Sequence, residues 1–163
     1  MSDRDAVEAA REKCFILYEG ARTPHRSCGI ALAETFNLPT EPYQALRKGG
    51  LTGCGECGAI MAGRLILGQF FGDPDPRGPA TETLKSAIAA YEARWRGRVD
   101  RGQAPGESIV CNTLTGQFAA FRGPERGRFC THLAAEVAAV CAEVILEHGG
   151  TFEVTPIDDL ADA

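Results

Sequence analysis

Seven cysteines in a chain of 163 residues are the side chains here best suited to chemistry. Two of them form a CxxC motif, Cys54-Gly55-Glu56-Cys57. Two residues between the sulfurs let a tight turn aim both at one point, which can be a metal ion, a cluster or a shared disulfide. The glycines beside the pair remove side chains that would obstruct this approach. The motif therefore predicts metal binding or thiol redox chemistry.

Four cysteines share a position at or near the start of a predicted helix: Cys28, Cys57, Cys111 and Cys130. Free backbone N–H groups at a helix start stabilise a thiolate, and basic neighbours lower a thiol pKa. Such neighbours flank two of the four, namely His25 and Arg26 before Cys28, and Arg126 and Arg128 around Cys130. We expect His25 to tune Cys28, and the four sulfurs to converge on one centre.

Cys14 and Cys141 differ from these four because each lies within an apolar helical pattern. A free cysteine in such a place behaves as a small hydrophobic residue, so we expect both in the core. Cys141 also follows Cys130 by eleven positions, or ~16 Å along a helix at 1.5 Å per residue. These two sulfurs cannot bind one small cluster.

Three other patterns are better explained without chemistry. Gly53-x-Gly55-x-x-Gly58 matches the dinucleotide-binding fingerprint, but no predicted strand precedes it and too few residues follow for a crossover helix and a second strand. His148 is expected to cap a helix end. The basic run from Arg94 to Arg101 is expected to be a solvated helix face rather than an RNA contact.

Helical periodicity dominates the rest of the chain, and no alternation of period two is long enough for a strand. Helices are expected over 3–19, 28–36, 41–48, 57–71, 82–99, 108–115, 117–121 and 126–148. The predicted fold is all-α, a compact single-domain bundle of about five to seven helices with a glycine-rich cysteine loop over 49–58. Residues 1–150 are expected to form the helical redox domain, and 151–163 an acidic, solvated tail.

The charge distribution argues against nucleic-acid binding. The net charge is −5, but five of the 22 acidic residues lie beyond residue 146, so the preceding part, with all 17 Lys and Arg, is neutral. No leader pattern and no apolar run of ~20 residues is visible, which favours a cytoplasmic protein without membrane insertion. In a reducing compartment, cysteines bind metals or catalyse more often than they form structural disulfides.

These residues resemble a family of redox-active proteins of similar size, the C_GCAxxG_C_C family, which is defined by a CGAxxG motif and four characteristic cysteines. The motif stands at 57–62 as Cys-Gly-Ala-Ile-Met-Ala, with Cys28 before it and Cys111 and Cys130 after it. The likeness covers about residues 7–145. Ala62 replaces the final glycine of the motif, and Cys54 is an addition to the four cysteines. A related cysteine domain accompanies haem in split-Soret-type cytochromes, so the resemblance implies electron transfer and an iron–sulfur centre.

The leading hypothesis is electron transfer or redox sensing through an iron–sulfur cluster, of the [2Fe–2S] type, bound by Cys28, Cys57, Cys111 and Cys130. Cys54 would be a spare ligand. The first alternative is a metal-free thiol–disulfide oxidoreductase in which Cys54 and Cys57 form the dithiol and Cys28 resolves. The second is a zinc-stabilised, non-catalytic module, although the long gaps between the cysteines do not match zinc-finger spacing. The expected partner is a redox protein, and a homodimer is an option.

Overall fold

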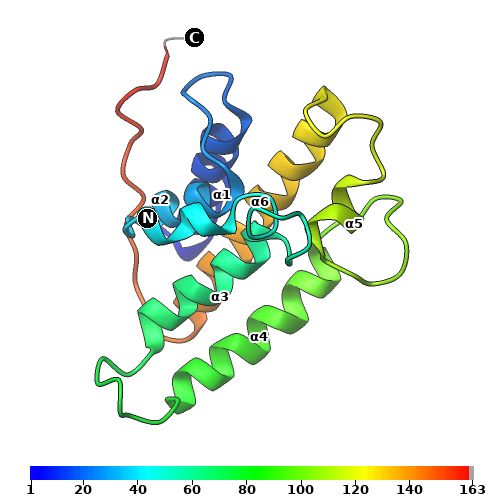
Figure 1. Cartoon of the computed structure of the whole chain (residues 1–163). Helices are drawn as coiled ribbons and strands as arrows, with labels where there is room; N and C mark the ends of the chain where they lie inside the picture. The colour runs from blue at the N-terminus through cyan, green and yellow to red at the C-terminus, as the bar shows by residue number, and fades with distance from the viewer. Residues whose placement is uncertain (162–163) are drawn as a thin grey trace.

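The described part of the chain folds into six α-helices and one 3₁₀ helix. Figure 1 shows how the α-helices are arranged. The computed structural model describes residues 1–161. In chain order the helices are α1 (Asp3–Glu19), α2 (Cys28–Thr35), η1 (Glu41–Leu46), α3 (Gly58–Phe71), α4 (Glu82–Arg98), α5 (Cys111–Thr115) and α6 (Pro124–Glu147). No β-strand forms in this part of the chain, where one isolated bridge joins Glu56 to Val110. The all-α prediction is confirmed, and a dinucleotide-binding fold is excluded.

α6 is the central helix, since α1, α2, α3 and α4 all pack against it. Its buried side chains are mostly alanine and valine, which are small enough for the neighbouring helices to approach closely. By length and composition α6 could cross a membrane, but 67% of its most apolar stretch is buried inside the fold. The core of the bundle therefore accounts for the apolar character of this helix.

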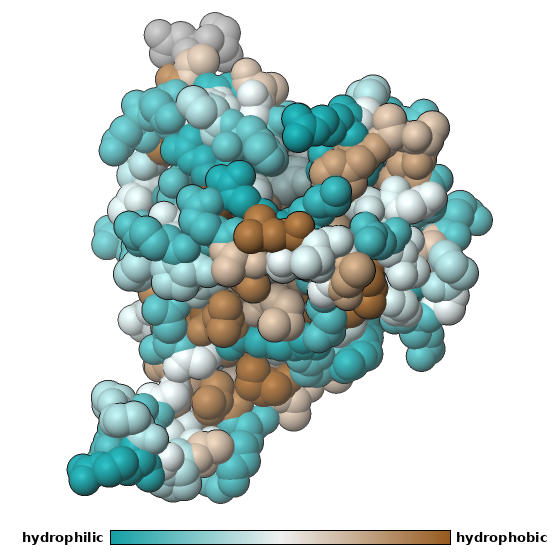
Figure 2. All heavy atoms as spheres, viewed as in Figure 1, coloured by the Kyte–Doolittle hydropathy of each residue, from teal (hydrophilic) through white to brown (hydrophobic). Residues whose placement is uncertain are grey.

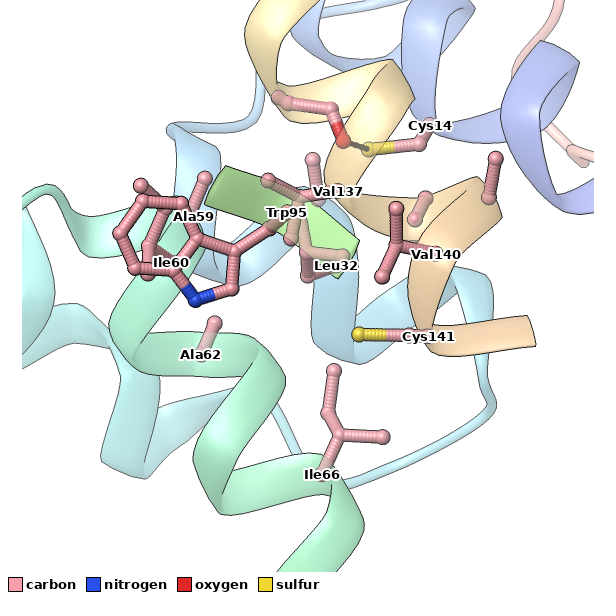
Figure 3. Close-up of a cluster of buried hydrophobic side chains, with 14 of the residues drawn as sticks. Cys14, Leu32, Ala59, Ile60, Ala62, Ile66, Trp95, Val137, Val140 and Cys141 are labelled. Atoms are coloured by element: carbon pink, nitrogen blue, oxygen red, sulfur yellow. Dashed lines mark hydrogen bonds between the residues drawn. The ribbon is translucent and has the colours of Figure 1, made fainter. Parts of the chain in front are cut away.

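The two cysteines predicted to pack in the core do so. Cys14 on α1 and Cys141 on α6 are both 0% exposed. The Cys14 thiol donates a weak hydrogen bond to the carbonyl oxygen of Ala134, at 3.5 Å. Figure 3 shows both sulfurs among apolar side chains such as Val140 and Leu32. Burial raises the pKa of both thiols, to about 12 for Cys14, which leaves them uncharged.

The basic run on α4 is only partly the solvated face that the sequence suggested, because Arg96 stays exposed whereas Arg94 and Arg98 pair with acidic residues of α6. Arg94 pairs with Glu143 and Glu147 of α6 at 3.2 and 2.8 Å. Arg98 pairs with Glu136 at 2.6 Å and with the same Glu143 at 2.5 Å. These half-buried ion pairs connect α4 to α6. Arginines used in this way are not free to bind RNA.

The acidic segment after residue 150 packs against the bundle up to residue 161, so the expectation of a solvated tail is wrong for the part described. Phe152 lies against the hydrophobic core. Lys13 Nζ of α1 donates to the carbonyl oxygen of Thr155 at 2.9 Å. Asp159 accepts from the hydroxyl of Thr23 at 2.6 Å. Figure 1 shows the segment running beside α2; residues 162 and 163 lie outside the described part.

Residues 117–121 form turns instead of the expected helix. The Gln117 side-chain amide donates to the carbonyl oxygens of Arg101, at 3.1 Å, and Leu114, at 2.6 Å. These two bonds fix a turn directly after α5, which itself is shorter than the predicted 108–115. The chain then reaches α6 through a loop that places Phe121 and Arg122 beside the cysteines.

Close contact between α3 and α4 depends on Gly63, so Gly63→Ala is expected to destabilise the fold by about 3 kcal/mol. A Cβ at position 63 would overlap the hydroxyl of Tyr91, which is fully buried and donates to the Ile60 carbonyl oxygen at 2.7 Å. Urea unfolding measures the loss. Gly68→Ala in the same helix is the matched control, because nothing lies within 4 Å of its Cβ position. That control should gain up to about 1 kcal/mol from helix propensity, and equal losses in both variants would contradict the packing argument.

Candidate functional site

Four cysteines from four distant segments line one cavity of about 440 Å³: Cys28, Cys57, Cys111 and Cys130. The cavity lies where the segment after α1 meets the beginnings of α2, α3, α5 and α6. Figure 2 shows the viewed face hollowed between the α1–α2 side and the beginning of α6. The structure thus brings together the four thiols that the sequence analysis grouped.

Three of the four cysteines stand at a helix start. Cys28 is the first residue of α2, Cys111 is the first of α5, and Cys57 is the N-cap of α3. Cys130 lies in the second turn of α6, because that helix already begins at Pro124. Cys130 is thus near the helix start, as expected, but beyond the free N–H groups of the first turn. Any cation that stabilises its thiolate must come from side chains.

Backbone pairing holds Cys57 and Cys111 side by side although 53 residues separate them in sequence. The N–H of Cys57 donates to the carbonyl oxygen of Ile109 at 2.7 Å, and the N–H of Cys111 donates to that of Gly55 at 2.9 Å. A third bond runs from the Asn112 N–H to the Gly53 carbonyl oxygen at 2.9 Å. The glycine-rich loop is thus fixed directly to the start of α5.

Two glycines permit the close approach of the cysteine-bearing segments. A Cβ at Gly58 would lie 2.8 Å from Cys28 Sγ and 2.5 Å from the Leu46 carbonyl oxygen. Gly49 has a left-handed φ of 56°, and a Cβ there would lie 2.6 Å from Cys111 Cβ. Larger residues at either place would push two of the cysteines away from the cavity. The glycine content of this loop is therefore a requirement of the site.

Burial raises the pKa of all four thiols. Cys28 reaches a pKa of about 12, because burial and the nearby Cys130 outweigh the amide of Gly29, which acts in the opposite direction. Cys57 is raised by burial first and then by Cys28. Cys111 is raised by burial and then by Cys130. The thiols lie within electrostatic reach of one another, so without added positive charge they stay protonated at neutral pH.

Arg126 is the cation that faces Cys130, from one helical turn earlier on α6. Burial raises the pKa of Cys130, whereas Arg126 lowers it in part. The guanidinium is fixed in place, because Nη1 donates to the hydroxyl of Tyr18 at 2.7 Å and Nε donates to the carbonyl oxygen of Phe121. The i,i+4 spacing of Arg126 and Cys130 is a sequence signal for this contact.

The cavity rim carries further cations that sequence analysis missed. Lys48 Nζ lies 4.9 Å from the centre of the Phe121 ring, and Arg126 Cζ lies 4.4 Å from it, so both cations contact the same ring. Arg47 and Arg122 also line the cavity. These residues come together only in the folded chain, so no local sequence pattern reveals the group. Within it, Lys48 has a left-handed φ of 47°.

The basic neighbours expected to tune Cys28 have different roles. Arg26 pairs with Glu34 and Asp159, both at 3.3 Å, and is absent from the cavity lining. His25 lines the cavity, but its Nδ1 donates to the carbonyl oxygen of Tyr18. His25 therefore links the loop before α2 to the end of α1. Its tuning of Cys28 stays a prediction.

Cys54 and its CxxC partner Cys57 lie in different environments. Cys54 is exposed and is not among the cavity-lining residues, whereas Cys57 is buried. Glu56 between them pairs with Arg64 at 3.1 Å. All seven cysteines are free thiols in this structure. The exposed thiol and the cavity thiols thus form two chemically different sets.

The described side chains do not form a ready single-ion site. Within residues 1–161, no three Cys, His, Asp or Glu side chains are grouped closely enough to hold one metal ion. The four thiols surround a space instead of meeting at a point. A ligand bound by all four thiols would have to be larger than one ion or would have to draw the sulfurs inward.

Comparison of the chain with models of protein families, with curated proteins and with solved structures finds no match.

Reaction with a thiolate-specific alkylating reagent at pH 8 should separate the two sets of thiols. A pKa of about 12 leaves roughly one Cys28 thiol in ten thousand ionised at that pH, and burial limits access as well. In the metal-free protein we expect one fast site, Cys54, and slow labelling of the cavity thiols, followed by mass spectrometry. Cys54→Ser should abolish the fast phase. Fast labelling of Cys28 or Cys57 would contradict the burial described here.

Proposed function

We propose that the chain is a redox-active protein in which Cys28, Cys57, Cys111 and Cys130 bind an iron–sulfur cluster, of the [2Fe–2S] type, for electron transfer or redox sensing. The supporting observation is that these four thiols, from four segments, line a single cavity. Four thiolates are the usual ligand set of such clusters. The resemblance to the C_GCAxxG_C_C family points in the same direction.

The absence of a three-ligand group within residues 1–161 favours a [2Fe–2S] cluster, in which each iron takes two thiolates, over a single zinc ion. A zinc ion bound at about 2.3 Å by four thiolates holds their sulfurs ~3.8 Å apart. In the described chain no three ligand side chains are grouped around one ion position. A cluster occupies several atoms' width, so its ligands can stand around a cavity. The zinc-stabilised module is thus the weaker alternative.

The charges around the cavity suit a negatively charged cluster. When bound, a [2Fe–2S] cluster with four thiolates supplies a one-electron redox couple and carries net negative charge. Arg126 and Lys48 oppose the raised pKa of Cys111, and Arg126 that of Cys130, so these cations favour the thiolate forms that a metal needs. Burial of Cys28 and Cys57 keeps water from the sulfurs. The cations would raise the reduction potential of the centre, whereas burial would lower it, because reduction adds negative charge.

The proposal implies a redox partner protein and a reducing, cytoplasmic setting in which the thiols stay free. Cys54, which is exposed, would lie outside the cluster and could exchange with a ligand only after the loop moves. In the thiol oxidoreductase alternative, Cys57 would have to leave its buried position to pair with Cys54. The fold gives no such geometry as it stands.

Anaerobic purification followed by iron and acid-labile sulfide analysis tests the proposal. We expect about two iron and two sulfide per chain, with visible absorption that changes on reduction. Cys28→Ser and Cys111→Ser should each lose most of the iron, because each removes one ligand. Cys54→Ser is the matched control and should keep it.

Two results would overturn the cluster proposal. Stoichiometric zinc without sulfide would assign the site to the zinc module. An iron-free protein with a reversible Cys54–Cys57 disulfide, lost in Cys54→Ser, would assign the chain to thiol–disulfide exchange.

A further inference from the structure

We propose that the rim of the cysteine cavity binds a small oxoanion of the phosphate or sulfate type, recognised by Arg126, Lys48 and the hydroxyl of Ser27. This site goes beyond the redox centre. It holds with or without a cluster, because the residues that carry it are not the cysteines.

The first observation is a concentration of cations that lack carboxylate partners. Four line the cavity: Arg47, Lys48, Arg122 and Arg126. Within residues 1–161 none of them pairs with a carboxylate, whereas seven arginines elsewhere do. The described lining of the cavity contains no Asp or Glu. Four cations without a carboxylate partner are thus concentrated around this cavity.

The second observation is an orphaned hydroxyl. Ser27 lines the same cavity, and its Oγ is the one buried side-chain N or O atom that finds no hydrogen-bond partner within the described chain. Ser27 is the N-cap of α2, but its side chain makes no capping bond. A buried hydroxyl without a partner costs free energy. Oγ is closed off from the open cavity as the structure stands, so an acceptor there would satisfy it after a rotation of the Ser27 side chain, and an anion is the acceptor that the neighbouring cations favour.

The third observation is that the cations are held in position. Arg126 is fixed by Tyr18 and by the Phe121 carbonyl oxygen, and Lys48 lies over the Phe121 ring. Lys48 also adopts a left-handed backbone, a conformation that non-glycine residues seldom hold without compensation. Pre-placed donors lose little side-chain entropy on binding. Guanidinium groups match the geometry of oxoanions, which favours phosphate or sulfate over chloride.

The charge balance leaves room for a dianion in both the metal-free form and the form with an oxidised cluster. Protonated thiols contribute no charge, so the four cations then stand alone. A [2Fe–2S] cluster with four thiolates in its oxidised form would carry about two negative charges, which still leaves positive charge on the rim. A cavity of about 440 Å³ is large enough for a small ligand beside the sulfurs. A neighbouring cavity shares Arg122 and Arg126 and adds Arg128, and its one acidic lining residue is Glu19.

Isothermal titration calorimetry tests the oxoanion site on both the iron-loaded and the metal-free protein. The titrants are inorganic phosphate and sulfate, with chloride at equal ionic strength as the control. We expect saturable binding of at least one oxoanion with a dissociation constant below about 1 mM. Arg126→Gln and Lys48→Gln should each weaken it about tenfold. Arg77→Gln removes the same charge beyond the far end of α3, in an exposed loop, and should change binding by less than about twofold.

Ser27→Ala separates recognition from folding. Because the hydroxyl has no partner, its removal should leave thermal stability without anion equal or higher, while anion binding weakens about threefold. A clear loss of stability in Ser27→Ala would mean that the hydroxyl serves the fold, and would remove this support.

Three outcomes would overturn the oxoanion site. One is the lack of saturable binding in either form of the protein. Another is an equal loss of binding in Arg77→Gln and Arg126→Gln, which would indicate general charge attraction. The third is binding of an acidic peptide such as poly-glutamate without competition from phosphate or sulfate, which would make the rim a protein-docking surface. Iron content is measured separately, so failure of the cluster and failure of the anion site are distinguishable.

Discussion

Backbone hydrogen bonds between the glycine loop and the segment before α5 are the constraint on which the cysteine site depends. They join Gly55 to Cys111, and Cys57 to Ile109, without forming a strand. Because the donors and acceptors are main-chain atoms, the alignment is fixed whatever the side chains do. It sets the starts of α3 and α5 next to each other, and Gly58 then lets the start of α2 approach until Cys28 Sγ lies over the α3 backbone. Three of the four thiols are placed by this one arrangement.

The fourth thiol is placed by a different element. α6 carries Cys130 in its second turn and Cys141 three turns later, so the same helix contributes to the cavity at one end and to the core at the other. At the core end, alanine and valine leave no space for a ligand, and Cys141 is one more small apolar side chain. At the cavity end, Arg126, Phe129 and Cys130 face an open volume. Cys141 is therefore a structural residue because neighbouring side chains fill the space around it. Cys130 is a candidate functional residue because the segments opposite it leave a cavity.

Much of the fold could be predicted from the sequence, because helix periodicity and glycine or proline punctuation are local signals. The same is true of Cys14 and Cys141, whose apolar spacing identified them as core residues. The cationic rim could not be found in this way, since Lys48 and Phe121 meet only after folding. Both the charged run on α4 and the acidic C-terminal segment were expected to be solvated, and both are partly packed against the bundle. Charge in a sequence suggests solvent exposure, but here Arg94 and Lys13 each find a partner on a distant segment. The turn at Gln117 was missed because its side-chain amide bonds to Arg101, 16 residues earlier, which no local pattern indicates.

Desolvation connects the sulfurs and the rim into one electrostatic unit. Burial holds the four thiols in their neutral form, and each thiolate that formed would make the next one costlier. Positive charge among the sulfurs, as a metal centre supplies, reverses that balance and releases protons. The rim presents the opposite situation, because its cations are permanent and repel one another. The neutral thiols lack a positive centre that would ionise them, and the rim cations lack a negative partner. The site therefore has two separate unmet electrostatic requirements. A ligand that fills only one of them leaves the other in place. The cluster with its four thiolates and the oxoanion both carry net negative charge and both use Arg126 and Lys48, so each would make binding of the other less favourable.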